Sequence, residues 1–212
     1  ATCNLTNCPE AIEQLSPAGL GEARRLPTSL PDVATGPGVW TVARTDDLWV
    51  SHDEGTSWTS IPFGFRCGEP ILAASSTEDL WMLCNDDMGS GAEAKSLYRS
   101  HHGGSTWTLV AQAAGFDISR TVGSLTVTGY ALQLVALSPA TALMEFGYPP
   151  GGVQLSTDGG ATWHWVGGNR PTSGTPTAGI VCASPTACWS TSVNWVLRSS
   201  ATLSTWSASE LS

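Results

Sequence analysis

An eight-residue motif recurs four times along the chain, and this repeat constrains the fold more than any other feature. Its pattern is S-x-D-x-G-x-T-W, and residues 156–163 match it at every defined position. The copy at 51–58 has Ser57 in place of Thr, and the copy at 100–107 has His102 in place of Asp. The copy at 199–206 keeps only Ser, Thr and Trp. Such self-similarity indicates a chain built from one supersecondary unit that is repeated.

Each motif has the chemistry of a tight turn between two strands. Asp53 and Asp158 can accept hydrogen bonds from backbone N–H groups of their own turns. Gly55 and Gly160 allow the positive φ that such turns need, and the Trp then begins a strand and buries a large apolar surface. We therefore expect a structural role rather than one in calcium binding or acid catalysis. The residues assigned this role are Ser51, Asp53, Gly55, Trp58, Ser100, Gly104, Trp107, Ser156, Asp158, Gly160, Trp163, Ser199 and Trp206.

Apolar runs precede each motif in a regular order. In the second repeat they predict strands at 71–75, 79–85, 95–100 and 106–110, which would form one four-stranded antiparallel sheet. The motifs begin at residues 51, 100, 156 and 199, so their spacings are 49, 56 and 43 residues. That is the length of one β-propeller blade. The sequence therefore predicts an all-β chain of propeller type with about four four-stranded antiparallel blades.

The motif resembles the Asp box of BNR repeats, which occur in sialidases, other glycoside hydrolases, sortilin-type receptors and photosystem assembly factors. The resemblance covers about residues 30–212 and implies a β-propeller, but one box serves many activities. Asp-box propellers usually close with six or more blades. The chain is then a compact propeller, a piece of a longer propeller, or an open array of blades that a partner completes. If the propeller does not close within one chain, an oligomer could cover the exposed sheet edges.

Residues 1–30 do not fit the repeat, so the sequence divides into an N-terminal cap or irregular segment at 1–30 and a repeat domain at 31–212. Residues 11–25 read as a short helix or an irregular cap. No apolar stretch approaches the roughly 20 residues of a membrane helix, so we expect no membrane insertion.

Six cysteines form three close pairs in the sequence, Cys3 with Cys8, Cys67 with Cys84, and Cys182 with Cys188. None lies in a C-x-x-C pair, and the four histidines have no paired spacing, so we expect neither a metal site nor a cofactor. Up to three local disulfides are predicted, with free buried thiols as the alternative. Disulfides would make the protein secreted or extracytoplasmic.

The charge balance excludes several kinds of partner. The net charge is −9, and Lys95 is the only lysine. Without clustered Lys and Arg the chain has no means of neutralising a nucleic-acid backbone or docking on an anionic membrane. A glycan or another protein is therefore the expected partner.

The expected ligand face is the one opposite the motif turns, because its connections at 85–93, 111–129, 147–152 and 167–179 are longer and more varied. Arg66, Arg120 and Arg170 each fall in a different connection between blades. Converging guanidinium groups would hold a carboxylate or phosphate, as the arginines of sialidases do. The alternative is three solvated loop arginines.

Aromatic side chains on the same face are the other binding candidates. Tyr148 lies in the loop before Pro149, and Trp165 and Trp195 lie outside the repeated positions, where they can stack on sugar rings or belong to the core. The core is the favoured place for both tryptophans, while Tyr148 and Trp195 are kept as candidate ligand contacts.

No constellation identifies a catalytic site. The Phe-Arg-Ile-Pro signature of sialidases is absent, and no spacing selects Tyr130, Tyr148 or Glu145 as catalytic. Asp86, Asp87 and Glu93 read as solvated loop charges, and the catalytic residues stay unknown. We therefore expect a non-catalytic extracytoplasmic binding or scaffolding module, with a sialidase-like glycoside hydrolase, or a fragment of one, as the alternative.

Overall fold

The structure is a computed structural model that describes residues 11–12, 15–16, 19–20, 24–27, 32–44, 46–89, 92–113, 125, 129–147, 152–166, 179–192 and 195–210. All regular structure in these residues is β-strand. Four of the sheets have four antiparallel strands each, in the order in which the strands follow one another along the chain. The predicted fold class, an all-β propeller-type array of four blades, is confirmed.

The four sheets are named blades 1 to 4. Blade 1 contains β5 (Asp32–Gly36), β6 (Val39–Ala43), β7 (Asp47–Ser51) and β8 (Thr59–Pro62). Blade 2 contains β9 (Glu69–Ala74), β10 (Leu80–Gly89), β11 (Ala92–Ser100) and β12 (Thr108–Ala113). Blade 3 contains β13 (Tyr130–Ala136), β14 (Ala142–Gly147), β15 (Gly152–Ser156) and β16 (His164–Trp165). Blade 4 contains β17 (Ile180–Ser184), β18 (Ala187–Ser192), β19 (Trp195–Ser199) and β20 (Trp206–Glu210).

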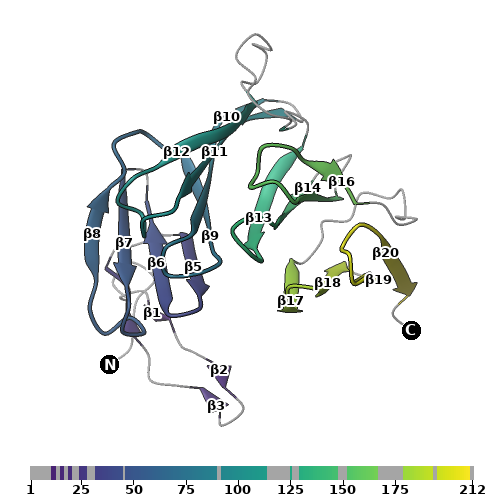
Figure 1. The fold of residues 1–212 in the computed structure, drawn as a ribbon, viewed down its shortest axis with the longest axis horizontal. Coiled ribbons are helices and arrows are strands. Elements are labelled where there is room, and N and C mark those ends of the chain that lie inside the picture. Colours follow the sequence, from purple (N-terminus) through teal and green to yellow (C-terminus); the bar gives the residue numbers. More distant parts are fainter. Residues whose placement is uncertain are drawn as a thin grey trace.

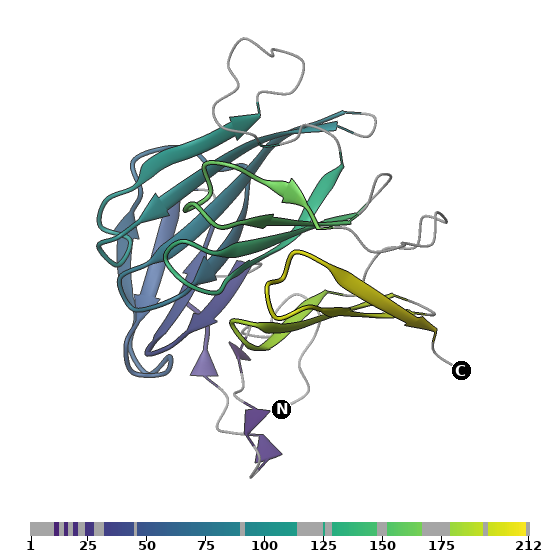
Figure 2. The ribbon, with the colours of Figure 1, turned by 45° about the vertical axis from the view of Figure 1, so that its right-hand side comes forward.

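The blades follow one another around a common centre, with the first strand of each blade innermost (Figures 1 and 2). Each blade begins with a strand running toward the motif turns, so the turn after the first strand and the motif turn share one end. Hydrogen bonds join these two turns, from Gly103 N–H to the Glu78 carbonyl at 3.0 Å and from Gly159 N–H to the Ala140 carbonyl at 2.9 Å. We call this end the motif face and the other end the opposite face.

The hydrophobic core is divided into three parts, one between each consecutive pair of blades. The cluster between blades 1 and 2 includes Leu48, Leu80 and Met82. The cluster between blades 2 and 3 includes Trp81 and Phe146. Between blades 3 and 4 the buried residues include Leu143, Val153 and Trp206. The second strands of blades 2 and 3 therefore contribute apolar side chains to the clusters on both of their faces, as the runs in the sequence predict.

One connection on the opposite face differs from expectation. Residues 85–93 were expected to form a long loop, but strands β10 and β11 continue past Asn85 to the pair Gly89 and Ala92, with an irregularity between Asn85 and Met88. The extended hairpin reaches the inner strand of blade 3, where the Asn85 amide donates to the Ala131 carbonyl at 3.4 Å. Contact with the neighbouring blade thus keeps this segment in strand form.

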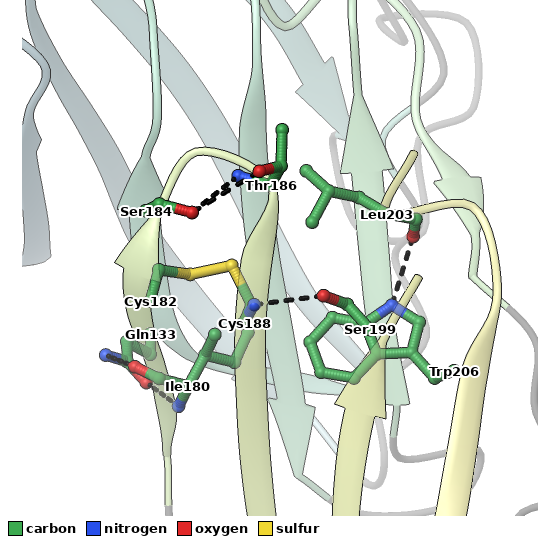
Figure 3. Close-up of a disulfide and its surroundings, with 9 residues drawn as sticks. All are labelled: Gln133, Ile180, Cys182, Ser184, Thr186, Cys188, Ser199, Leu203 and Trp206. Carbon is green, nitrogen blue, oxygen red and sulfur yellow. Dashed lines mark hydrogen bonds between the residues drawn. A yellow bond between two sulfur atoms is a disulfide. The ribbon is translucent and has the colours of Figure 1, made fainter. Parts of the chain in front are cut away.

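Two disulfides tie first and second strands together. Cys67, which lies just before β9, is bonded to Cys84 of β10. Cys182 of β17 is bonded to Cys188 of β18 across the hairpin of blade 4 (Figure 3). Both are pairs that the sequence predicts. Cys3 and Cys8 lie outside the described residues.

Of the two alternatives for residues 11–25, a short helix or an irregular cap, the helix is not formed by the described residues of that segment. They form four two-residue strands, β1 (Ala11–Ile12), β2 (Leu15–Ser16), β3 (Gly19–Leu20) and β4 (Arg24–Arg25), paired as β1 with β4 and β2 with β3. Arg24 lies against blade 1 at the motif face, since a Cβ placed on Gly55 would be 3.2 Å from Cβ of Arg24 and 2.9 Å from the Trp40 ring. Pairing between these short strands supplies the backbone hydrogen bonds that a helix would make internally. Across the described residues no helix is long and apolar enough to cross a membrane.

Candidate ligand-binding face

The motif turns satisfy their own polar groups. In the first copy, the Ser51 hydroxyl donates to the Asp53 carboxylate at 2.8 Å and accepts from Gly55 N–H at 2.8 Å. The carboxylate also accepts from the backbone N–H and the hydroxyl of Ser57, at 2.8 Å and 2.6 Å. These hydrogen bonds, led by the Ser57 hydroxyl, lower the pKa of Asp53 to about 2.

The third copy repeats this arrangement with Ser156, Asp158 and Thr162. Partial burial opposes ionisation of Asp158, but the hydrogen bonds from Thr162 outweigh it and lower the pKa of the carboxyl. In the second copy Ser100 accepts from the N–H groups of His102 and Gly104 without help from an Asp. A carboxylate occupied by its own turn has little capacity left for a ligand.

Of the site residues that the sequence predicts on the opposite face, the structure describes one in full. The Arg66 side chain is exposed, just after Phe65 in the connection between blades 1 and 2. Arg120, Arg170 and Tyr148 lie outside the described residues. Trp195 lies at the start of β19, and nothing is described of its side chain. Whether the three arginines converge therefore stays a prediction.

Trp165 is not a core residue as expected. Its indole is 45% exposed at the outer strand of blade 3, and its ring centroid lies 5.4 Å from that of buried Phe146 at an angle of 56°. Strand β16 is only two residues long, and nearly half of the indole surface stays accessible beside it. An indole held on one side and open on the other is suited to stacking on a sugar ring or an apolar side chain.

Glu93 is not a solvated loop charge. Its carboxylate is buried and accepts from Ala131 N–H at 3.1 Å, with the Lys95 ammonium 3.6 Å away. The Lys95 ammonium is fully buried, donates to the Glu93 and Gly129 carbonyls at 3.0 Å and 2.8 Å, and lies 5.6 Å from the centre of the Phe146 ring. Burial raises the pKa of Glu93 and lowers that of Lys95 to about 8. The pair joins blades 2 and 3.

Other acidic groups near this face also contact the protein itself. The Asp86 carboxylate accepts from Gly68 N–H at 3.3 Å and from the Ser96 hydroxyl at 3.4 Å. Glu145 is buried on β14 and accepts from the Ser190 hydroxyl of blade 4 at 3.5 Å. Asp87 lies in β10, and nothing is described of its side chain.

The innermost strands surround a central cavity of about 540 Å³. All four blades contribute to its wall, through β5, β9, β13 and β17. Most residues that line the cavity are apolar, although polar atoms make up at least half of its accessible surface. The polar side chains among its described residues are those of Asp32, Thr35 and Gln133, apart from the disulfide-bonded Cys182.

Side chains from neighbouring blades satisfy the free edges of these inner strands. The Asp32 carboxylate of blade 1 accepts from Leu72 N–H of blade 2 at 2.5 Å. The Gln133 amide of blade 3 accepts from Ile180 N–H at 2.6 Å and donates to the Ile180 carbonyl at 3.0 Å (Figure 3). An edge strand without such partners would carry unpaired backbone groups. Sequence reasoning missed Asp32 and Gln133, although a polar residue within an apolar inner-strand run was the available signal.

Neither a protein-family model nor a curated protein matches the chain. Among solved structures, the chain is similar to YCF48 bound to a D1 peptide, with a TM-score of 0.55 and 13% identity over 96% of this chain and 57% of that one. It is similar to the GH74 xyloglucanase from Xanthomonas campestris, with a TM-score of 0.54 and 13% identity over 84% of this chain and 30% of that one.

A lectin from Aleuria aurantia in complex with Fucα1-6GlcNAc has a TM-score of 0.52 and 12% identity, over 93% of this chain and 66% of the lectin. At such identities these likenesses show the β-propeller fold alone. The chain spans 57%, 30% and 66% of the lengths of these three propellers. They include a peptide-bound protein, a glycoside hydrolase and a lectin, so the shared fold does not select one activity.

Proposed function

We propose that the chain is a non-catalytic binding or scaffolding module that recognises a glycan or protein partner through the face opposite the motif turns. Residues 1–30 are proposed as a cap on the repeat domain at 31–212. The observation that carries the proposal is that Asp86, Glu93 and Glu145 accept hydrogen bonds from the protein itself. The indole of Trp165 and the guanidinium group of Arg66, in contrast, are exposed.

Glycoside hydrolysis by the common mechanism needs two carboxyl groups about 5–10 Å apart on either side of the scissile bond. Glu93 and Glu145 are buried and bonded within or between blades. Among the described residues that line the central cavity, Asp32 is the single carboxylate. This distribution favours binding over hydrolysis and makes a hydrolase the less supported alternative.

The proposed partner surface includes Trp165 and Arg66. An exposed indole supplies a large apolar area at small entropic cost, and a guanidinium group recognises carboxylates or phosphates. Arg66 lies in the connection between blades 1 and 2, and Trp165 lies beside Gln154, midway along β15. We propose that Arg120, Arg170, Tyr148 and Trp195 belong to the same surface.

The two disulfides support an extracytoplasmic location. Each closes a short loop, with a sequence separation of 17 between Cys67 and Cys84 and of 6 between Cys182 and Cys188. Such bonds persist in oxidising compartments and are rare where glutathione and thioredoxin keep thiols reduced.

The proposal is tested by glycan-array and pull-down measurements beside assays with a fluorogenic sialoside and a polysaccharide panel. We expect binding without turnover. The Trp165→Ala and Arg66→Ala variants should bind at least about tenfold more weakly than the wild type, a loss of about 1.4 kcal/mol. Leu109→Ala is the matched control, because Leu109 is exposed on β12 to a similar extent, 38%.

Turnover by the wild type, with no binding in either assay, would contradict the proposed function. Equal weakening by the Leu109 control would show that the loss reflects general surface change and not a site at Trp165.

A further inference from the structure

The central cavity combines exposed aliphatic side chains with one ionisable side chain. Its described lining contains Leu132, which is 48% exposed, and Val181, which is 70% exposed. These are the two most exposed large aliphatic side chains among the described residues. Leu132 sits at an irregularity of β13, between the paired residues Ala131 and Gln133, so the strand leaves its regular course at this point.

Asp32 is the ionisable member of the wall. Its carboxylate accepts from Leu72 N–H, and burial raises its pKa to about 6, so it is ionised at neutral pH. Within the described residues no cationic side chain is paired with it, and no Lys, Arg or His lines the cavity. A partly buried carboxylate bonded to backbone N–H groups alone leaves its negative charge uncompensated.

The three groups lie in the same half of the molecule. Asp32 is the first residue of β5, Val181 the second of β17 and Leu132 the third of β13. Since each inner strand runs toward the motif face, these positions are nearer the opposite face, where the proposed function places the partner.

We propose that the central cavity binds a ligand that joins an apolar body to one protonated amine, with the ammonium group at Asp32 and the apolar body against Leu132 and Val181. The inference deepens the proposed binding function by naming a ligand class. A carboxylate ligand is disfavoured in the cavity, because it would meet Asp32 without a cation in the described wall. Gln133 is already occupied by both backbone groups of Ile180, which leaves Asp32 as the main polar contact.

Calorimetric titration of the whole chain with hexylamine, hexanol and hexanoate tests the ligand class at constant chain length. We expect hexylamine to bind at least about tenfold more tightly than hexanol, and hexanoate to bind most weakly. The Asp32→Asn variant should lose the preference for amine over alcohol and keep its affinity for hexanol. Its amide oxygen can still accept from Leu72 N–H, so the strand contact is retained.

Glu78→Gln is the matched control, since it makes the same change of charge at an exposed carboxylate in a motif-face turn. It should leave all three affinities unchanged. Val181→Ser should weaken hexylamine and hexanol alike. Two peptides distinguish sources of the amine: Leu-Gly-Gly tests a chain N-terminus against the free alkyl amine, and its N-acetylated form should not bind.

Lowering the pH from 7 to 5 should weaken hexylamine binding to the wild type, because Asp32 becomes protonated while the amine stays charged. Glu69 on β9 and Arg44 just after β6 are the other charged groups of the elements packed against β5, and neither lines the cavity.

Equal or tighter binding of hexanoate, or an amine preference that survives Asp32→Asn, would overturn the inference. Absence of binding by all three probes would also overturn it, even if a glycan or protein partner is captured on the opposite face. In that case the proposed function stands and the cavity has no part in it.

Discussion

At the scale of single residues, the motif glycines do two things at once. Gly160 has φ of +93°, and a Cβ at this position would lie 2.7 Å from a Leu97 methyl and 2.9 Å from the Trp81 ring. A Cβ placed on Gly104 would likewise lie too close to a methyl group of Leu48 in blade 1. The glycine therefore closes its own turn and also lets that turn pack on the preceding blade.

Gly160→Ala should destabilise the chain by roughly 2–5 kcal/mol, from the left-handed backbone conformation together with overpacking. Gly64→Ala is the control, because Gly64 has φ of +74° and nothing within 4 Å of its Cβ position. It should lose only about 1–2 kcal/mol. Urea unfolding of both variants measures the difference, and equal losses would mean that the close approach to blade 2 has no energetic weight.

Asp32 should make stability depend on pH. Its folded-state pKa of about 6 lies above the ordinary value of 3.8, so the folded state binds the proton more tightly than the unfolded state does. This contribution stabilises the protein below pH 4 and is lost as the pH rises to about 6. Urea unfolding between pH 4 and pH 7 should give a decline for the wild type that Asp32→Asn lacks. An identical decline in the variant would assign it to other groups.

At the scale of elements, the sequence predicts much of blade 2. Strands expected at 71–75, 79–85, 95–100 and 106–110 are observed at 69–74, 80–89, 92–100 and 108–113. Periodicity finds the strands because each buries apolar side chains. It does not find the extension of β10 and β11 past residue 85, because that segment is held by the long-range contacts of Asn85, Glu93 and Lys95 with blade 3. Such contacts leave no local pattern.

The contribution of the Lys95–Glu93 pair to stability can be measured by replacing first one partner and then both. Lys95→Met leaves a buried carboxylate without its cation and should destabilise the chain by about 3–5 kcal/mol. The double change Glu93→Gln with Lys95→Met should lose clearly less, because no buried charge remains. Denaturant unfolding compares the two, and a double variant as unstable as the single one would show that packing, and not charge, determines the loss.

At the scale of the whole molecule, the blades are joined by polar contacts as well as apolar ones. From the sequence, the candidate site could be predicted only as one face of the molecule, with Arg66 and Trp165 as single candidate residues. The cavity could not be predicted, because its wall comes from four segments far apart in the chain. The sequence also favours the core for Trp165, because a large apolar side chain is usually buried, whereas its actual exposure depends on tertiary packing.

Gln133→Leu should loosen blade 4 selectively, because it removes both hydrogen bonds to Ile180 while the apolar contacts between blades 3 and 4 stay. Hydrogen exchange should show faster exchange of the β17–β18 amides, with blades 1 and 2 unchanged. Gln112→Leu is a control within one blade, since that amide contacts Ser96 of the neighbouring strand. Uniform acceleration in all blades would indicate a single cooperative unit.

The side chains that satisfy inner-strand backbone groups in a neighbouring blade share one direction along the chain. In the described residues, Asp32 of blade 1 serves blade 2, Glu93 and Asn85 of blade 2 serve blade 3, and Gln133 of blade 3 serves blade 4. During synthesis the earlier blade therefore leaves the ribosome already carrying the groups that the next inner strand requires. As the chain grows toward its C-terminus, each new blade packs on a blade that is already complete. Loss of an N-terminal blade, in contrast, removes hydrogen-bond partners from the inner strand of the blade that follows it.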